Sequence, residues 1–310
     1  MSGTLIDVSG AIDLHCHPYP DLFPRLADDV GIARHAQGRG LRAVMIKCHH
    51  ENSVSRAYLT QQLVPDLRLF GGVVLNSYVG GINPAAVEAA LRLGGKEVWM
   101  PTIDSAYHAE MHGGTGTYDS QASGEASRPG ISAIDAHGDL RPEVLEILEL
   151  IAQHNAILGT CHLSPNEIVL LVTTARERGV QKILITHPFF KVPNLDLDVL
   201  QQLASLGAYA EFGYCTVSPM WNYATLKKVA NAIQVLGSSC CVLVSDAGQR
   251  HNPMPAEALR LFAQGIFECG VPEEDIYRMI RDNPADLLEL GPEPELAEPA
   301  DPAAPAGSDA

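Results

Sequence analysis

Histidine and aspartate residues stand at the ends of several short apolar stretches of the sequence. One stretch runs into His15 and His17, and because side chains alternate along an extended chain, both imidazoles lie on the same side of it. The stretches "AILGTCH", "KILITH" and "CVLVSD" end on His162, His187 and Asp246. Neutral imidazole and carboxylate are the groups that zinc and similar divalent ions prefer, and three or four such ligands with one open position make a catalytic site. The set therefore predicts a divalent metal centre.

Taken singly, each of these residues has an ordinary structural explanation, since histidines at strand ends are often hydrogen-bonded core residues. Taken together, ionisable groups at four strand ends of one barrel would cost on the order of several kcal/mol in desolvation if nothing compensated them. A bound metal is the usual compensation. The complete set thus favours a metal over a collection of separate structural roles.

The elements that must position these residues are eight short apolar, β-rich stretches that alternate with helical patterns. The stretches are Ala11–His15, Leu41–Lys47, Leu69–Leu75, Glu97–Pro101, Ala156–His162, Lys182–His187, Ala208–Phe212 and Cys241–Asp246. Helix signals lie between them: Pro84 follows Asn83, and Ser164 forms a capping box with Glu167. Strand alternating with helix predicts a parallel sheet, and right-handed crossovers favour its closure as a single (β/α)₈ TIM barrel with its site at the carboxyl ends of the strands. An open doubly wound sheet is the alternative, but its glycine-rich nucleotide-binding motif is missing.

Two segments interrupt this alternation. Ile103–Leu140 contains a glycine-rich stretch, and a connection of this length predicts a lid over the site. Gly291–Ala310 consists largely of proline, alanine and acidic residues, so we expect a disordered acidic tail after a barrel domain over residues 1–290.

Composition excludes several classes of protein. The 310 residues carry a formal net charge of −16 and no basic stripe, which argues against nucleic acid and anionic lipid as partners. No apolar run reaches the ~20 residues of a membrane span, and the N-terminus has no secretory signal pattern. Seven cysteines without a CxxC pair favour reduced thiols in a cytoplasmic protein. We expect a small-molecule substrate as the partner, and the sequence leaves open whether the chain forms a homo-oligomer.

Basic and aromatic residues in the expected strand-end loops are candidates for substrate binding. Lys47 and Arg25 would bind a carboxylate in an otherwise acidic protein, as would Arg56, Lys191 and Arg250. The aromatic residues there suit a compact, partly apolar substrate. The substrate-binding candidates that we single out are Lys47, Arg25, His49, Phe189, Tyr214 and Trp221. The alternative is that these are rim and packing residues.

The His-x-His pair, the histidines that end the fifth and sixth stretches and the aspartate that ends the eighth resemble the pattern of the amidohydrolase superfamily. The closing "DNPADLLEL" is similar to the helix that often ends those barrels, and the likeness covers about Ala11 to Leu290. Within the superfamily, "DLHCHPYPDLFPR" and "AVMIKCHH" look like a small, poorly characterised subgroup. The resemblance implies a (β/α)₈ metal-dependent hydrolase whose metal ligands are His15, His17, His162 and Asp246.

One departure from that pattern bears on the number of metal ions. Two-metal members carry a carbamylated Lys or a Glu at the end of strand four, and here that stretch ends "WMPT". The resemblance therefore implies a single ion, with zinc as the first choice. Lys47 as a carbamate or anion anchor, and His49, His108 or His112 as ligands of a second ion, are the alternatives.

The resemblance also implies a mechanism. The metal lowers the pKa of its water toward ~7, Asp246 accepts the proton and passes it to the leaving group, and His187 orients the water or the substrate. We expect a hydrolase that cleaves an amide, lactone or other ester-like bond in a small substrate, a carboxylate-bearing one included. Three alternatives stay open: a metal-dependent decarboxylase of a small aromatic or unsaturated acid, a metal-dependent phosphoesterase, and a barrel that only binds a ligand.

Overall fold

The computed structural model describes residues 4–118 and 128–291. Eight parallel strands form one sheet in sequence order. They are β1 (Ile12–Cys16), β2 (Ala43–Ile46), β3 (Arg68–Val74), β4 (Glu97–Trp99), β5 (Ile157–Gly159), β6 (Lys182–Thr186), β7 (Tyr209–Gly213) and β8 (Cys241–Val244). Each strand overlaps one of the eight apolar stretches, so the prediction of a single (β/α)₈ barrel is confirmed.

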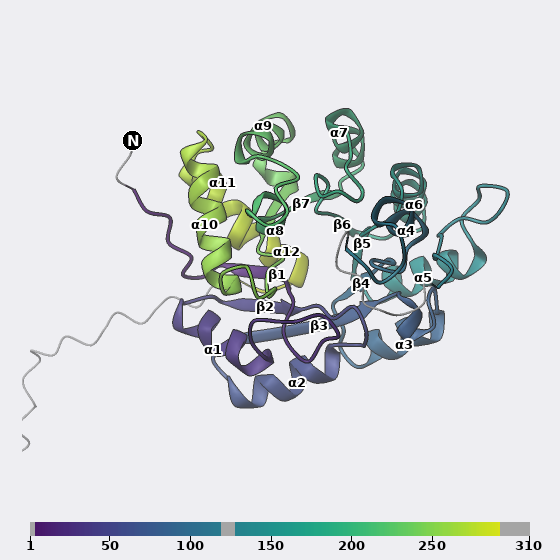
Figure 1. Cartoon of the computed structure of the whole chain (residues 1–310), viewed down its shortest axis with the longest axis horizontal. Helices are drawn as coiled ribbons and strands as arrows, with labels where there is room; N and C mark the ends of the chain where they lie inside the picture. The colour runs from purple at the N-terminus through teal and green to yellow at the C-terminus, as the bar shows by residue number, and fades with distance from the viewer. Residues whose placement is uncertain (1–3, 119–127, 292–310) are drawn as a thin grey trace, which may run out of the picture.

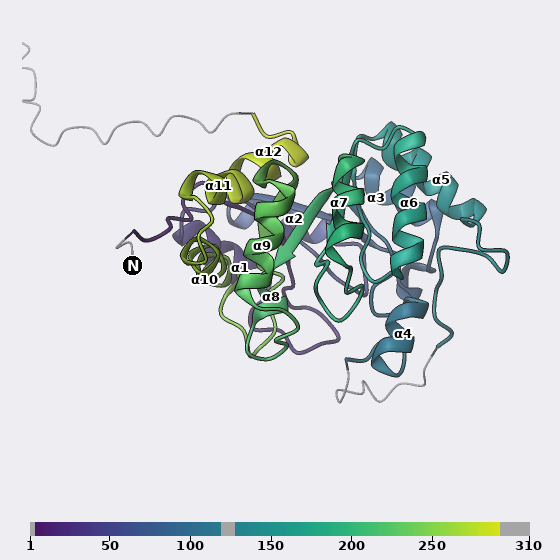
Figure 2. The same cartoon turned by 90° about the horizontal axis from the view of Figure 1, so that it is seen from above.

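Helices cover the outside of the barrel. Those in the described ranges are α1 (Asp29–Gly38), α2 (Val54–Leu63), α3 (Pro84–Arg92), α4 (Ala106–His112), α5 (Pro142–Gln153), α6 (Pro165–Glu177), α7 (Leu197–Ser205), α8 (Tyr214–Val217), α9 (Leu226–Leu236), α10 (Pro255–Glu268), α11 (Glu273–Tyr277) and α12 (Asn283–Leu288). In Figure 1, α1, α2 and α3 lie below the strands, α7 and α9 lie above them, and α10 lies to their left. Figure 2 shows α4 and α8, which follow strand ends, on one side of the barrel and α12 on the opposite side.

The helix signals in the sequence act as expected. Ser164 Oγ accepts a hydrogen bond from the Glu167 amide, and Glu167 Oε2 accepts one from the Ser164 amide at 2.9 Å, which completes the capping box of α6. The side chain of Asn83 caps α3, with Pro84 at its first position. Caps of this kind are each worth about 1 kcal/mol, and they fix where the helices begin relative to the strands.

The barrel closes between β8 and β1 with the help of a side chain. The backbone contact between the two is an isolated parallel bridge from Cys16 to Ala247. The buried carboxylate of Asp13 lies across the same seam, where its Oδ1 accepts from the amides of Ser245 at 3.0 Å and His15 at 3.2 Å. Asp13 therefore ties the strand that carries His15 to the strand that precedes Asp246.

Two glycines make room for the large side chain at the centre of the barrel. A Cβ on Gly159 would lie 2.6 Å from the Trp99 ring, and one on Gly72 would lie 2.7 Å from it. Trp99 is fully buried. A side chain at either glycine position would force this indole out of the barrel interior.

Both interrupting segments fall partly outside the described residues. Of the predicted lid, residues 103–118 and 128–140 are described, and Ile103, His108 and Ala133 in them are fully buried. These arms pack against the barrel, and closure of the segment as a lid stays a prediction. Apart from Gly291, the predicted tail lies outside the described residues. No helix in the described ranges is long and apolar enough to span a membrane.

Candidate metal centre

The carboxyl ends of the strands surround a cavity of about 220 Å³. His15, His17, His162, His187 and Asp246 all line it. They come from the ends of β1, β5, β6 and β8, so the barrel brings together the residues that the sequence separates by more than two hundred positions. This is the end of a (β/α)₈ barrel at which active sites lie.

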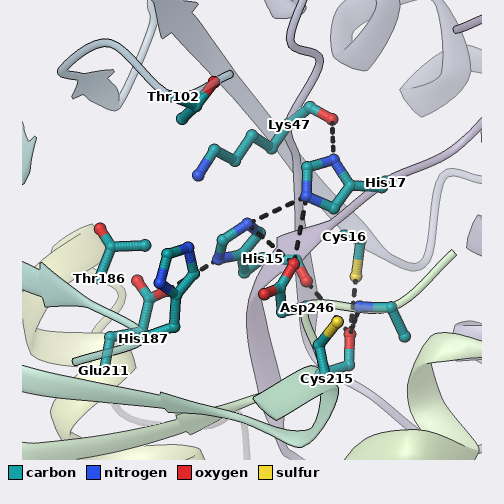
Figure 3. Close-up of polar contacts among 12 residues, drawn as sticks. His15, Cys16, His17, Lys47, Thr102, Thr186, His187, Glu211, Cys215 and Asp246 are labelled. Atoms are coloured by element: carbon teal, nitrogen blue, oxygen red, sulfur yellow. Dashed lines mark hydrogen bonds and ion pairs between the residues drawn. The ribbon is translucent and has the colours of Figure 1, made fainter. Parts of the chain in front are cut away.

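His15, His17 and Asp246 form the tightest group in the cavity (Figure 3). The Nε2 atoms of the two histidines are 3.1 Å apart. Asp246 Oδ1 lies 3.3 Å from Nε2 of His15 and 3.2 Å from Nε2 of His17. All three side chains are nearly inaccessible to solvent, so three donor atoms meet in a small volume shielded from water.

The backbone at the strand ends adopts unfavourable conformations to present these groups. His187 has φ 30° and Asp246 has φ 45°, values that residues with a side chain rarely adopt. A left-handed conformation of this kind costs on the order of 1–3 kcal/mol and tends to occur at functional sites. The loop after Asp246 adds a strict requirement: a Cβ on Gly248 would lie 1.9 Å from the carbonyl oxygen of His17.

A hydrogen bond fixes which ring nitrogen of His17 carries its proton, and a carboxyl group contacts the corresponding nitrogen of His15. His17 Nδ1 lies 3.1 Å from the carbonyl oxygen of Lys47, which can only accept, so this nitrogen is the donor. His15 Nδ1 lies 2.7 Å from Glu211 Oε1. Burial lowers the pKa of both imidazoles well below the ordinary value, so each is neutral and Nε2 of His17 presents a lone pair.

The protonation of Glu211, which contacts His15, depends on the charge at this site. Burial raises the pKa of Glu211 to about 8. A cation bound on the far side of the imidazole would offset this cost, and Glu211 would then ionise and accept a hydrogen bond from Nδ1 of His15. With the cation bound, Nε2 of His15 would present a lone pair as well.

The donor set fits a divalent cation. The Nε2 atoms of His15 and His17 and Oδ1 of Asp246 face one another at 3.1–3.3 Å, and Nε2 of His17 carries no proton. A cation among these three atoms would be bound by the lone pair of His17 and the carboxylate of Asp246, and by His15 once Glu211 ionises. Histidine nitrogens with one carboxylate are the ligands of catalytic zinc. The residues present therefore fit the metal that the sequence suggests.

His162 lies in the same cavity but outside this tight group. Its Nε2 is 3.2 Å from His187 Nε2, and its Nδ1 is 2.8 Å from His108 Nδ1 on α4. His108 Nε2 lies 2.7 Å from the carbonyl oxygen of Thr117 and must donate to it. A neutral His108 therefore accepts at Nδ1, His162 donates there, and Nε2 of His162 is left with a lone pair that faces the cavity. His108, expected only as a ligand of a second ion, thus supports His162 through a hydrogen bond.

The predicted substrate-binding residues divide into two groups. Lys47, Arg25, His49 and Trp221 line the cavity. The side chain of Lys47 extends into it, with Nζ 3.6 Å from Cys161 Sγ (Figure 3). His49 stacks on His17 at a centroid distance of 4.7 Å.

Two of the expected aromatic contacts lie elsewhere. The Phe189 ring packs on Phe212 at 5.6 Å under Lys228, and Tyr214 packs against the hydrophobic core. The next residue in the sequence, Phe190, was also among the aromatic residues expected in these loops, and it lines the cavity. A turn follows β6, and sequence periodicity does not predict which of two adjacent side chains such a turn directs inward.

Two of the basic residues that were expected to bind substrate lie outside the cavity. Arg56 binds Asp29 and Glu51 in ion pairs of 2.7 and 2.8 Å, and neither Arg56 nor Lys191 lines the cavity. The positions that the sequence analysis missed include Glu211, Tyr118 and Phe23. Glu211 carried a signal, because an acidic residue within the apolar stretch of β7 has to point into the barrel.

Comparisons with known proteins place the chain in a family. A model described as a family of unknown function, DUF6282, matches residues 10–211. The chain belongs to this family. No curated protein matches the sequence.

Solved structures share the fold of this DUF6282 member. An amidohydrolase from Pseudomonas aeruginosa is 12% identical with a TM-score of 0.56, covering 91% of this chain and 96% of that one. The phosphotriesterase homology protein from Escherichia coli is 14% identical with a TM-score of 0.55, covering 90% and 99%. A 2,6-dihydroxybenzoate decarboxylase is 11% identical with a TM-score of 0.53, covering 91% and 100%. The matches thus have the barrel of the amidohydrolase superfamily, as the sequence resemblance implied, and at these identities they bear on fold alone.

Proposed function

We propose that this protein is a metal-dependent hydrolase that cleaves an amide, lactone or other ester-like bond in a small substrate. The observation that carries the proposal is the meeting of His15, His17 and Asp246 at 3.1–3.3 Å, at the carboxyl end of a (β/α)₈ barrel. His162 completes the ligand set, because His108 leaves its Nε2 unprotonated toward the same cavity. Zinc is the ion that we propose for these nitrogens and one carboxylate.

The residues of the chain divide the work. When bound, the ion supplies a nucleophilic water near neutral pH and polarises the scissile carbonyl. Asp246 faces the two imidazoles through Oδ1, which leaves Oδ2 to take a proton and hand it to the leaving group. His187, whose ring stacks 6.2 Å from that of His15, orients the substrate or water from β6. Burial keeps the pKa of His187 low, at about 3, so it acts as a neutral hydrogen-bonding group.

The cavity suits a compact, partly apolar substrate. Its volume of about 220 Å³ is that of a small molecule, and aromatic side chains form part of its wall. Lys47, Arg25 and Arg250 line it, whereas Asp246 is its one acidic lining residue in the described ranges. We therefore propose a substrate that carries a carboxylate. A cytoplasmic enzyme with no nucleic-acid or membrane partner is consistent with the charge of −16.

Decarboxylation is the second candidate. One of the matched structures is a decarboxylase complexed with 2,6-dihydroxybenzoate, an aromatic acid. The same cavity and the same metal ligands would serve that reaction. The observation that favours hydrolysis is Asp246, whose free oxygen is placed to accept the proton of a water.

The two reactions differ in their products. Purified protein loaded with zinc is screened against amides, lactones and aryl carboxylates in water enriched in oxygen-18. Hydrolysis puts one labelled oxygen atom from solvent into the acid product, whereas decarboxylation releases carbon dioxide and leaves the remaining product unlabelled. Turnover without label would overturn the hydrolase proposal.

A further inference from the structure

The guanidinium of Arg25 is a cation built firmly into the cavity wall. Its side chain is only 3% exposed, although it lines the cavity. Nε and Nη2 both bind Oδ2 of Asp21, at 3.0 and 2.7 Å. The guanidinium also lies over the Phe23 ring at 5.6 Å. Contacts on its edge and on its face therefore fix its position.

Asp21 is itself held in place. Its Oδ1 accepts from the Phe23 amide at 2.9 Å and lies 3.1 Å from His50 Nδ1. Burial opposes ionisation of this carboxyl, but the hydrogen bond from His50 and the charge of Arg25 lower its pKa well below the usual range. Asp21, Cys48 and His50 lie close enough to bind a cation. Because Asp21 is already neutralised, the cluster is better explained as the support of Arg25.

The guanidinium keeps capacity for another anion. Nε and Nη2 share a single oxygen of Asp21, and no other carboxylate lies within 4 Å of Arg25 in residues 4–118 and 128–291. Arg250 lines the same cavity, is exposed, and forms no ion pair with any described carboxylate. In a chain of net charge −16, two arginines that converge on one cavity mark a binding place for an anion.

Four aromatic rings, tilted to one another, adjoin these arginines. The Phe23 and Tyr118 rings are 5.7 Å apart, Tyr118 and Trp221 are 5.4 Å apart, and Trp221 and Phe190 are 5.7 Å apart. All four rings line the cavity. A continuous aromatic wall favours a planar, apolar ligand body, and the fork of a guanidinium matches a carboxylate.

We propose that Arg25 is the anchor for the carboxylate of a planar aromatic or unsaturated acid. The ring of this acid lies against the aromatic wall formed by Phe23, Tyr118, Trp221 and Phe190. The reactive group of the acid faces His15, His17 and Asp246. Arg250 adds a weaker contact from the solvent side. This proposal rests on the proposed function for the identity of the reacting end, and it adds the class of substrate and the residue that selects it.

Benzoate and its neutral analogue benzamide test the anchor directly. Their dissociation constants are measured by calorimetry on zinc-loaded wild type, Arg25→Met, Lys47→Met and Arg250→Met. Arg260→Met serves as the control, since Arg260 pairs with Glu257 on α10 and does not line the cavity. We expect Arg25→Met to weaken benzoate by about 10–100-fold and to leave benzamide unchanged. Arg250→Met should weaken benzoate less, and Arg260→Met should not change it.

An unchanged benzoate affinity in Arg25→Met, with metal content and melting temperature intact, would overturn the proposal. A loss seen in Lys47→Met and not in Arg25→Met would overturn it too, in favour of Lys47 as the anchor. If Arg25→Met does not fold, Arg25→Lys replaces it, because lysine keeps the charge and loses the fork; a selective loss of benzoate is again expected, and an unchanged benzoate affinity again contradicts the anchor. Binding is measured without turnover, so tight benzoate with no hydrolysis of any ester or amide would refute the proposed function alone.

Discussion

Single hydrogen bonds decide the chemistry of the histidines in this cavity. His17 is oriented by the carbonyl of Lys47, His15 by Glu211, and His162 by His108. Each partner binds Nδ1 and leaves Nε2 to the cavity. Carboxylates and carbonyls in this position commonly account for 10–100-fold in metal affinity. The support of each ligand therefore matters as much as the ligand.

His108 offers a test of this view, because it touches the centre only through His162. We expect His108→Leu to weaken zinc by about 10–100-fold, since His162 loses the acceptor that keeps its proton on Nδ1. His108→Asn, whose side-chain oxygen lies near the position of Nδ1, should restore part of the affinity. The measurements are zinc affinity by competition with a chelator and the ¹⁵N shifts of His162.

A purely packing role for His108 predicts a different result. Leu and Asn would then change the melting temperature while His162 kept the same protonated nitrogen in both variants. Equal zinc affinity in wild type and His108→Leu would contradict the role given to it here.

The two roles proposed for Asp246, metal ligand and general base, can be tested separately. Asn at this position keeps the shape and one oxygen but has almost no basicity. Asp246→Asn should retain most of the metal and lose roughly 10²–10⁴-fold in kcat, the usual worth of a positioned general base. Metal content, melting temperature and kcat are measured on the same preparation. Full activity per folded molecule would refute the mechanism.

At the scale of the elements, the alternation of strand and helix could be predicted because each strand lies in a short, mostly apolar stretch. The ends of β1, β5, β6 and β8 were readable for the same reason, since parallel strands of a barrel end at one face. Side-chain pairing between distant elements was not readable. That His162 would pair with His108 depends on the packing of α4, which nothing in the local sequence of either residue specifies.

The barrel interior contains acidic groups that the strand pattern alone did not explain. Glu97 on β4 is fully buried, and neither carboxylate oxygen has a hydrogen-bond partner. Burial, and then the nearby charge of Glu211, raise the pKa of Glu97 well above the usual value. The folded protein therefore holds a proton at Glu97 that the unfolded chain loses above about pH 4.5.

This difference predicts a pH-dependent effect of Glu97→Gln. A carboxyl whose pKa is raised on folding stabilises fully below its unfolded pKa and loses that contribution as the pH rises toward its folded pKa. Gln carries no proton to lose. The stability of Glu97→Gln relative to wild type should therefore rise with pH, by up to about 1.4 kcal/mol per unit. Urea unfolding of both proteins at about pH 5, 6 and 7 measures it. Parallel profiles would show that Glu97 is ionised in the fold.

At the scale of the whole molecule, the candidate reactive residues gather at one end of the barrel, where acidic side chains are few. The chain is acidic overall, yet the cavity is lined by Lys47, Arg25 and Arg250 and by one carboxylate among the described residues, Asp246. Composition alone predicts the sign of the total charge but not where the charged side chains lie. The role of Ile103–Leu140 was predictable only in part, because Tyr118 reaches the cavity from within a segment that looked structureless.

Metal content tests the central claim most directly. Wild type, His17→Ala and the control His137→Ala, whose side chain is exposed, are incubated with zinc, freed of excess ion and assayed by elemental analysis. We predict about one zinc per chain in wild type and His137→Ala, and a large loss in His17→Ala at an unchanged secondary-structure content. Folded wild type without bound zinc, or with two equivalents of similar affinity, would contradict a single metal centre at His15, His17, His162 and Asp246.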